Sequence, residues 1–194
     1  MMGKIKIYWV GSASRTGIDE TRTRLGIGTF TTRKMIAVAF LSSIAALLQA
    51  MGGILPGIGF LFSPFATAPI VISSLLSAGS GLLAYVLTLL LLLFIQPSEL
   101  VVFPLTTGLL ALGIGLSLFY LKTRLAAVLV GAVVLCSGIL LLLSVFRFPV
   151  LGPAVSPAID FKTAALIFVF SLFYSWLWVE VSMLLIRKLN RRNE

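Results

Sequence analysis

Long apolar runs fill the chain from Thr32 to Leu189, and charged residues are confined to short segments between these runs. A transmembrane helix needs about 20 predominantly apolar residues, so this part of the chain has room for about six. The pattern therefore predicts an all-α polytopic membrane protein with a six-helix transmembrane domain over residues 32–189. Residues 1–31 and 190–194 are expected to be basic cytoplasmic tails, the longer one mobile.

Glycine, proline and serine set the expected limits of the helices. Gly52 and Gly53 are expected to end the first helix, and residues 52–62 are expected to form an outer loop. Ser63 and Pro64 are typical of a helix start, and the second helix is about 15 residues, or roughly 22 Å, shorter than the hydrocarbon core. The six helices are expected at about 33–51, 63–79, 82–96, 99–121, 125–145 and 159–186.

The later connections are expected to be short. Residues 79–81, Gly-Ser-Gly, are expected to form a tight joint, and residues 122–124 form another. The fourth helix begins either near Glu99 or, if Pro104 occupies its first turn, a little later. A third connection, residues 147–157, contains three prolines and is expected to be a second outer loop.

Basic residues lie mainly at the two ends of the chain. Seven precede or begin the first helix, and four follow the last: Lys4, Lys6, Arg15, Arg22, Arg24, Arg33, Lys34, then Arg187, Lys188, Arg191 and Arg192. Lysine and arginine mark cytoplasmic ends, so both termini are expected to be cytoplasmic. Lys122 and Arg124 then also lie inside, after four crossings. The charge predicts contact with anionic lipid headgroups rather than nucleic acid.

Composition argues against an enzyme or a metal site. The chain has no histidine, and its single cysteine, Cys136, lies within an apolar run. Histidine is the commonest metal ligand and the commonest general base at neutral pH. No catalytic residue, metal or cofactor is therefore expected.

Polar residues near the expected outer ends of the helices are candidate ligand-binding residues. A charge at the centre of a membrane span costs at least about 2.5 kcal/mol, so charged residues near or within the membrane are candidates for a functional role. Solvation at the membrane interface is the alternative explanation. The candidates are Gln49, Gln96, Glu99, Arg147, Asp160 and Lys162.

The last helix adds aromatic and acidic candidates. Tyr174 and Trp176 lie near mid-depth, where they could stack on a planar ligand or simply pack in the bundle. Glu180 lies roughly 10 Å inside the inner end of this helix. An ion pair with Arg187 or Lys188 is expected for it, with proton coupling as the alternative.

Small residues repeat every four positions along the first helix. They are Ala39, Ser42, Ser43, Ala46 and Ala50. Small residues let two helices approach closely in lipid. They are candidates for an interface, either within the bundle or with the helix of a separate membrane subunit.

Together these features resemble the substrate-capture (S) subunits of energy-coupling factor (ECF) transporters. The shared features are the small-residue first helix, the Pro/Gly-rich loop before a short second helix, and the proline-rich loop before the sixth. The resemblance implies that a vitamin-like organic ligand binds near the outer side. It also implies that an Ala-xxx-Ala pair on the first helix, here Ala46 and Ala50 or the more cytoplasmic Ala39 and Ser43, docks a membrane coupling subunit driven by two ATPases.

The leading functional hypothesis is the substrate-binding subunit of an ATP-driven uptake transporter in a prokaryotic plasma membrane. Energy would come from partner subunits, because the sequence lacks the G-x-x-x-x-G-K-[ST] phosphate loop. The alternative is a membrane scaffold or assembly protein with no small-molecule site.

Overall fold

The computed structural model describes residues 32–55, 57–146 and 161–191, and this part of the chain consists of helices and the turns between them. The predicted tail over residues 1–31 lies outside it, as do residues 192–194 of the tail predicted over 190–194. The elements are α3 (Thr32–Ile54), α4 (Gly59–Phe62), the 3-10 helix η1 (Ser63–Ala66), α5 (Thr67–Leu76), α6 (Ala78–Ile95), α7 (Glu99–Val102), α8 (Thr107–Tyr120), α9 (Arg124–Val145) and α10 (Phe161–Arg191).

Five helical segments are long and apolar enough to cross a membrane: Thr32–Ile54, Ala78–Ile95, Glu99–Tyr120, Arg124–Val145 and Phe161–Leu185. The sixth predicted helix is the short one, formed by the four residues of η1 and the ten of α5. The prediction of an all-α polytopic membrane protein is therefore confirmed. Large apolar side chains such as Phe40, Phe94 and Val133 are exposed on the outside of the bundle, as expected for surfaces that face lipid.

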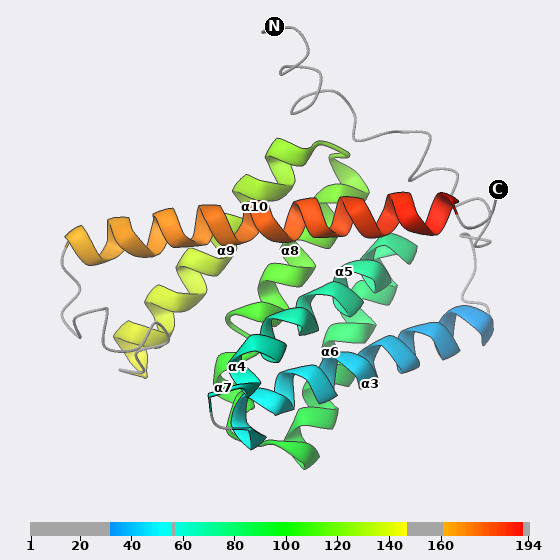
Figure 1. Ribbon diagram of the computed structural model, residues 1–194, viewed down its shortest axis with the longest axis horizontal. Helices are drawn as coiled ribbons and strands as arrows, with labels where there is room; N and C mark the ends of the chain where they lie inside the picture. The colour runs from blue at the N-terminus through cyan, green and yellow to red at the C-terminus, as the bar shows by residue number, and fades with distance from the viewer. Residues whose placement is uncertain (1–31, 56, 147–160, 192–194) are drawn as a thin grey trace, which may run out of the picture.

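The helices pack as a bundle in which α10 crosses α8 and α9, and in the view of Figure 1 α5 lies between α10 and α3. α3 packs mainly on α6, α5 packs on α6 and α8, and α9 packs on α8 and α10. The beginning of α3 and the end of α10 lie on the same side of the bundle. This arrangement agrees with the expected placement of both basic ends on one side, and the cytoplasmic orientation stays a prediction.

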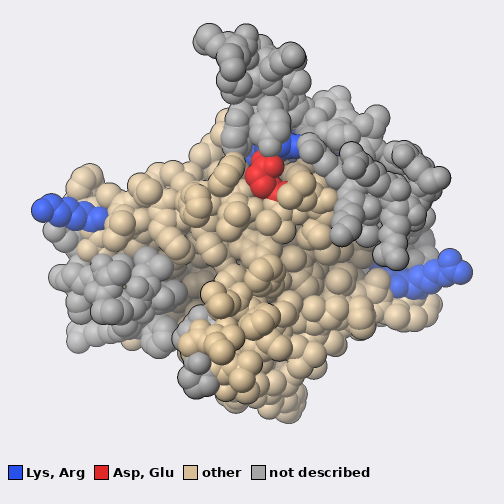
Figure 2. Space-filling view, in the orientation of Figure 1, with Lys and Arg blue, Asp and Glu red and all other residues tan. Residues whose placement is uncertain are grey.

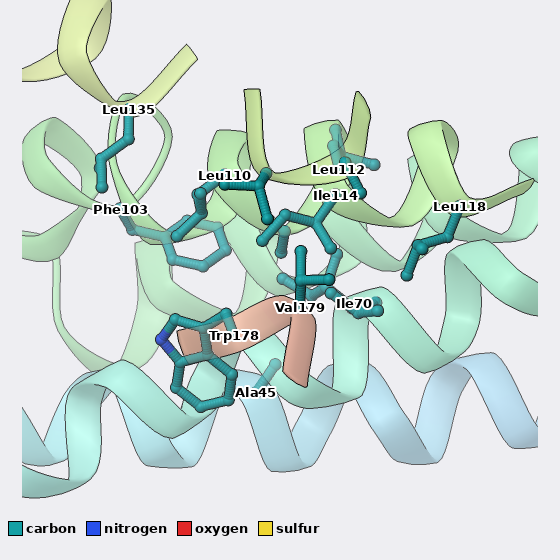
Figure 3. Close-up of a cluster of buried hydrophobic side chains, with 14 of the residues drawn as sticks. Ala45, Ile70, Phe103, Leu110, Leu112, Ile114, Leu118, Leu135, Trp178 and Val179 are labelled. Atoms are coloured by element: carbon teal, nitrogen blue, oxygen red, sulfur yellow. The ribbon is translucent and has the colours of Figure 1, made fainter. Parts of the chain in front are cut away.

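The core is formed where α5, α8, α9 and α10 meet (Figure 3). Ile70, Ile114, Leu118 and Val179 are fully buried there, and Trp178 is almost fully buried. Figure 2 shows a face whose described side chains are mostly uncharged, with basic side chains at its two ends and an acidic side chain beside a basic one near its upper middle.

The predicted end of the first helix at Gly52-Gly53 is wrong. α3 continues to Ile54, and α4 lies within the segment expected to be an outer loop. The two glycines are packing positions: a Cβ at Gly52 would lie 3.3 Å from Ser63 Cβ, and a Cβ at Gly53 would overlap the Gln96 side chain. Tertiary contacts therefore stabilise a helical end that glycine by itself disfavours.

The predicted joint at residues 79–81 is also wrong. These residues form the first turn of α6, and the chain reverses at Ser77, whose backbone is extended (φ −168°, ψ 159°). Ser77 Oγ accepts a hydrogen bond of 3.1 Å from the backbone N–H of Ser80 and so caps the helix. Gly81 is small because it packs against Ser74 of α5.

The fourth predicted helix is interrupted at Pro104. α7 begins at Glu99, one of the two starting points considered, and ends at Val102. α8 begins only at Thr107, so Pro104 does not occupy its first turn. The buried ring of Phe103 stacks on Tyr85 of α6 with centroids 5.9 Å apart, and Tyr85 Oη donates to the Pro104 carbonyl at 3.2 Å. Because of this break, α7 and the beginning of α8 are separate helices at the same end of the bundle. The last helix also runs beyond the predicted domain end, because α10 continues to Arg191.

Candidate functional site

A buried polar cluster joins α3, α7 and α8. Gln49 is only 2% exposed, and its Nε2 donates to Glu99 Oε2 at 2.7 Å. Its Oε1 accepts from Thr107 Oγ1 at 2.9 Å. Each polar atom of the Gln49 side chain therefore has a partner on a different helix, which fixes the orientation of the amide.

Local structure explains why these three residues meet. The break at residues 103–106 places Glu99 on α7 and Thr107 at the start of α8, and both reach Gln49. Gly52, one turn after Gln49 on α3, lets Glu99 approach this helix closely: a Cβ there would lie 3.6 Å from Glu99 Oε1. Ser63 of η1 lies against the same glycine. Thr107 and Ser63 were not predicted as site residues, although Ser63 stands where the second helix was expected to begin.

Gln96 belongs to the same end of the bundle. Its side chain lies against Gly53, and its Nε2 donates to Ser98 Oγ at 3.0 Å. Three of the predicted ligand-binding residues, Gln49, Gln96 and Glu99, therefore lie close together around the end of α3.

The remaining predicted ligand-binding residues are not joined to this cluster by any described contact. Arg147 and Asp160 lie outside the described residues, and Lys162 is exposed in the first turn of α10. Tyr174 is half-buried and stacks on Phe170 with centroids 5.6 Å apart. Trp176 is 39% exposed and lies beside Phe173 on the outside of the bundle.

Trp178 is the aromatic residue of α10 that turns inward. It is 3% exposed, and its ring meets Phe65 of η1 edge-on with centroids 5.8 Å apart. Since Ser63 of η1 lies near Glu99 and Phe65 lies against Trp178, η1 stands between the polar cluster and the aromatic residues of α10. Trp178 follows Phe170 and Tyr174 at spacings of four residues, which puts the three on one stripe of α10, but this spacing cannot show that the Trp178 end faces the core.

Some buried polar atoms around α10 have no hydrogen-bond partner in the structure: Thr67 Oγ1, Ser171 Oγ, Ser175 Oγ and Trp178 Nε1. Thr67 is the first residue of α5, one turn after Ser63. Ser175 lies directly against Gly131 of α9, since a Cβ at that glycine would be 2.8 Å from Ser175 Oγ. The contact between α9 and α10 is therefore close at this point, with no room for a ligand.

Glu180 pairs with Arg124 at the opposite end of the bundle. Arg124 Nη1 lies 3.5 Å from Glu180 Oε1, and the two side chains are 5% and 24% exposed. The expected partners, Arg187 and Lys188, have side chains outside the described set. Since Arg124 begins α9 and Glu180 lies about 28 Å along α10 at 1.5 Å per residue, the pair is near a membrane surface rather than deep within the bilayer.

The small residues of α3 divide between two faces. Ser42, Ala46 and Ala50 are buried within the bundle, and Ser42 Oγ lies 3.3 Å from the Ala84 carbonyl of α6. Ala39 and Ser43 are exposed on the other side, where Ser43 bonds only to the backbone of its own helix. The structure thus assigns three of the five predicted interface residues to packing within the chain.

In the described part of the chain, no group of three or more His, Cys, Asp or Glu side chains could hold a metal ion. The polar cluster offers instead one carboxylate, one fixed amide and hydroxyl groups. Such groups can bind a polar organic molecule by hydrogen bonds and charge.

Replacing Gln49 with leucine is expected to destabilise the protein by about 1–3 kcal/mol, because Thr107 loses an acceptor and Glu99 loses a donor. The free energy of unfolding in mixed micelles measures this loss. Gln96→Leu is the matched control, since that amide is only half-buried and bonds to an exposed serine. Equal stability of the two variants would show that the cluster does not stabilise the fold.

Comparison with known proteins identifies no relatives: no model of a protein family, no curated protein and no solved structure matches this chain.

Proposed function

We propose that this protein is the substrate-binding membrane subunit of an ATP-driven uptake transporter for a vitamin-like small organic molecule. The observation that carries the proposal is the Gln49–Glu99–Thr107 cluster, a fixed polar site at one end of an otherwise apolar bundle. With the basic ends of the chain in the cytoplasm, this end faces outward, towards the source of a substrate. The membrane is proposed to be a prokaryotic plasma membrane.

The proposal gives the chain a binding role and no catalytic role. The ECF-like order of elements supports this assignment, in particular the short helical segment of η1 and α5 between the long helices α3 and α6. Transport energy would come from a membrane coupling subunit and two ATPase subunits. Ala39 and Ser43 are small and exposed on α3, so a helix of the coupling subunit could pack closely against this face.

Native mass spectrometry of the full chain, purified in detergent from its source cell, tests the proposal. We expect one small organic molecule per chain, together with the coupling subunit and the ATPases. A chain that repeatedly carries neither would contradict the proposal and favour a membrane scaffold.

A paired substitution tests the coupling surface. Ser43→Leu is expected to reduce co-purification of the coupling subunit and to leave the small molecule bound, because the added bulk faces outward. Ser137→Leu on α9 is the matched control, since Ser137 is also exposed and also bonds only to its own helix. Equal co-purification of the two variants would show that the subunit does not pack at Ser43.

A further inference from the structure

The charges of the described residues leave one carboxylate without a basic partner. Two acidic side chains are described, Glu99 and Glu180, and Glu180 pairs with Arg124. Glu99 accepts a hydrogen bond from the neutral Gln49 amide, and no described basic group lies within ion-pair distance of it. Arg33 and Lys34 belong to the far end of α3, about 22 Å from Gln49 along the helix.

The hydrogen bonds around Glu99 suit its charged form. Because Gln49 Oε1 accepts from Thr107, the amide presents its N–H group to Glu99. An N–H donor stabilises a carboxylate, which can only accept hydrogen bonds, and the short distance of 2.7 Å is typical of a charge-assisted bond.

Neither the dipole of α7 nor a metal-binding set of side chains compensates the negative charge of Glu99. α7 has only four residues, so its dipole is small. The described residues around Glu99 include no other carboxylate, and Ca²⁺ or Mg²⁺ sites normally use several oxygen ligands. The second carboxylate oxygen, Oε1, makes no described hydrogen bond, and it lies near Gly52, where a Cβ would be 3.6 Å from it.

We infer that the ligand of this site carries an organic cation, a protonated amine or a quaternary ammonium group, and that Glu99 is its counter-ion. This inference rests on the proposed function and specifies the class of its substrate. A partly buried carboxylate is costly until a positive charge pairs with it. The ligand supplies that charge, while Gln49 and Thr107 hold the carboxylate in position.

The test uses the small molecule that the full chain carries from its source cell, identified and quantified by mass spectrometry. We expect a molecule with a cationic nitrogen at neutral pH. Glu99→Gln, which keeps the size of the side chain, is expected to reduce its occupancy per folded chain at least about tenfold at subsaturating concentration. Glu180→Gln is the matched control, since it removes a carboxylate at the other end of the bundle, and it should change occupancy less than about twofold.

A displacement experiment separates an organic cation from an inorganic one. Tetramethylammonium chloride should release the carried molecule more effectively than sodium chloride at equal ionic strength. Equal release by the two salts, a neutral or anionic carried molecule, or full occupancy in Glu99→Gln would each overturn the inference while leaving the proposed binding function intact. A chain that carries no small molecule would overturn both.

Discussion

Alanine at Gly138 is expected to destabilise the protein by about 3 kcal/mol, at the upper end of the range for overpacked positions. Gly138 lies in the middle of α9, and a Cβ there would overlap the backbone carbonyl oxygen of Leu105. A backbone atom cannot rotate away as a side chain can. α9 would have to move away from the break between α7 and α8, or the break itself would have to shift.

Gly113→Ala is the matched control, because this glycine also lies inside a transmembrane helix. Its Cβ would meet Val134 at an ordinary distance of 3.6 Å, and alanine favours a helix over glycine by about 1 kcal/mol. Equilibrium unfolding in mixed micelles, followed by tryptophan fluorescence, compares the two variants with the unmodified chain. If Gly138→Ala matched Gly113→Ala in stability, the close contact between α9 and Leu105 would be wrong.

Separating Arg124 from Glu180 is expected to give the second large effect. Replacing Glu180 with alanine removes the carboxylate that faces a guanidinium group only 5% exposed. Loss of one partner of a fully buried ion pair costs about 3–5 kcal/mol. We expect about 1–3 kcal/mol here, because Glu180 is 24% exposed and water screens part of the interaction.

A double-mutant cycle measures the ion pair itself. The free energy of unfolding is determined for Arg124→Ala, Glu180→Ala, the double variant and the unmodified chain, with Lys162→Ala as a control for loss of an exposed charge. The two single changes should be non-additive by about 0.5–3 kcal/mol, the range for residues in contact. Strict additivity would show that the two side chains do not interact in the membrane.

The Arg124–Glu180 pair and the Glu99 carboxylate have different proposed roles. The Arg124–Glu180 pair joins the first residue of α9 to the second half of α10, and both of its charges belong to the chain. The carboxylate of Glu99 is held by a neutral amide, so a bound ligand can supply the positive charge that pairs with it. A substitution at Glu180 should therefore act mainly on stability, and Glu99→Gln mainly on binding.

The sequence predicted the membrane class and most helix limits because these features are local. The apolar run of α9 begins directly after the charged residues Lys122 and Arg124, and Pro97 follows the end of α6. Length and composition were therefore sufficient to predict these helix limits. Glycine was less informative. Gly52 and Gly81 look like breaks in the sequence, but both lie inside helices and are small because another helix approaches there.

The site was predicted only in part. Gln49, Gln96 and Glu99 were identified as outer polar residues, and the structure brings them together at the end of α3. Ser63 was missed because a hydroxyl at the expected start of a helix is ordinarily a cap, and Thr107 was missed because it lay inside the expected fourth helix. Tyr174 and Trp176 stay a prediction: Tyr174 stacks on Phe170 and Trp176 lies beside Phe173, and no described contact joins either to the polar cluster.

Sequence alone determined that this chain crosses a membrane in several helices, where most of them begin and end, and which polar residues are rare enough to need an explanation. Only the tertiary structure decided which face of each helix points inward: Ser42 is buried against α6, whereas its neighbour Ser43 is exposed. It likewise decided that Glu180 meets Arg124 and that Glu99 meets Gln49. The physical reason is that lipid is as apolar as the interior of the bundle, so the hydrophobic pattern that orients helices in water is absent here.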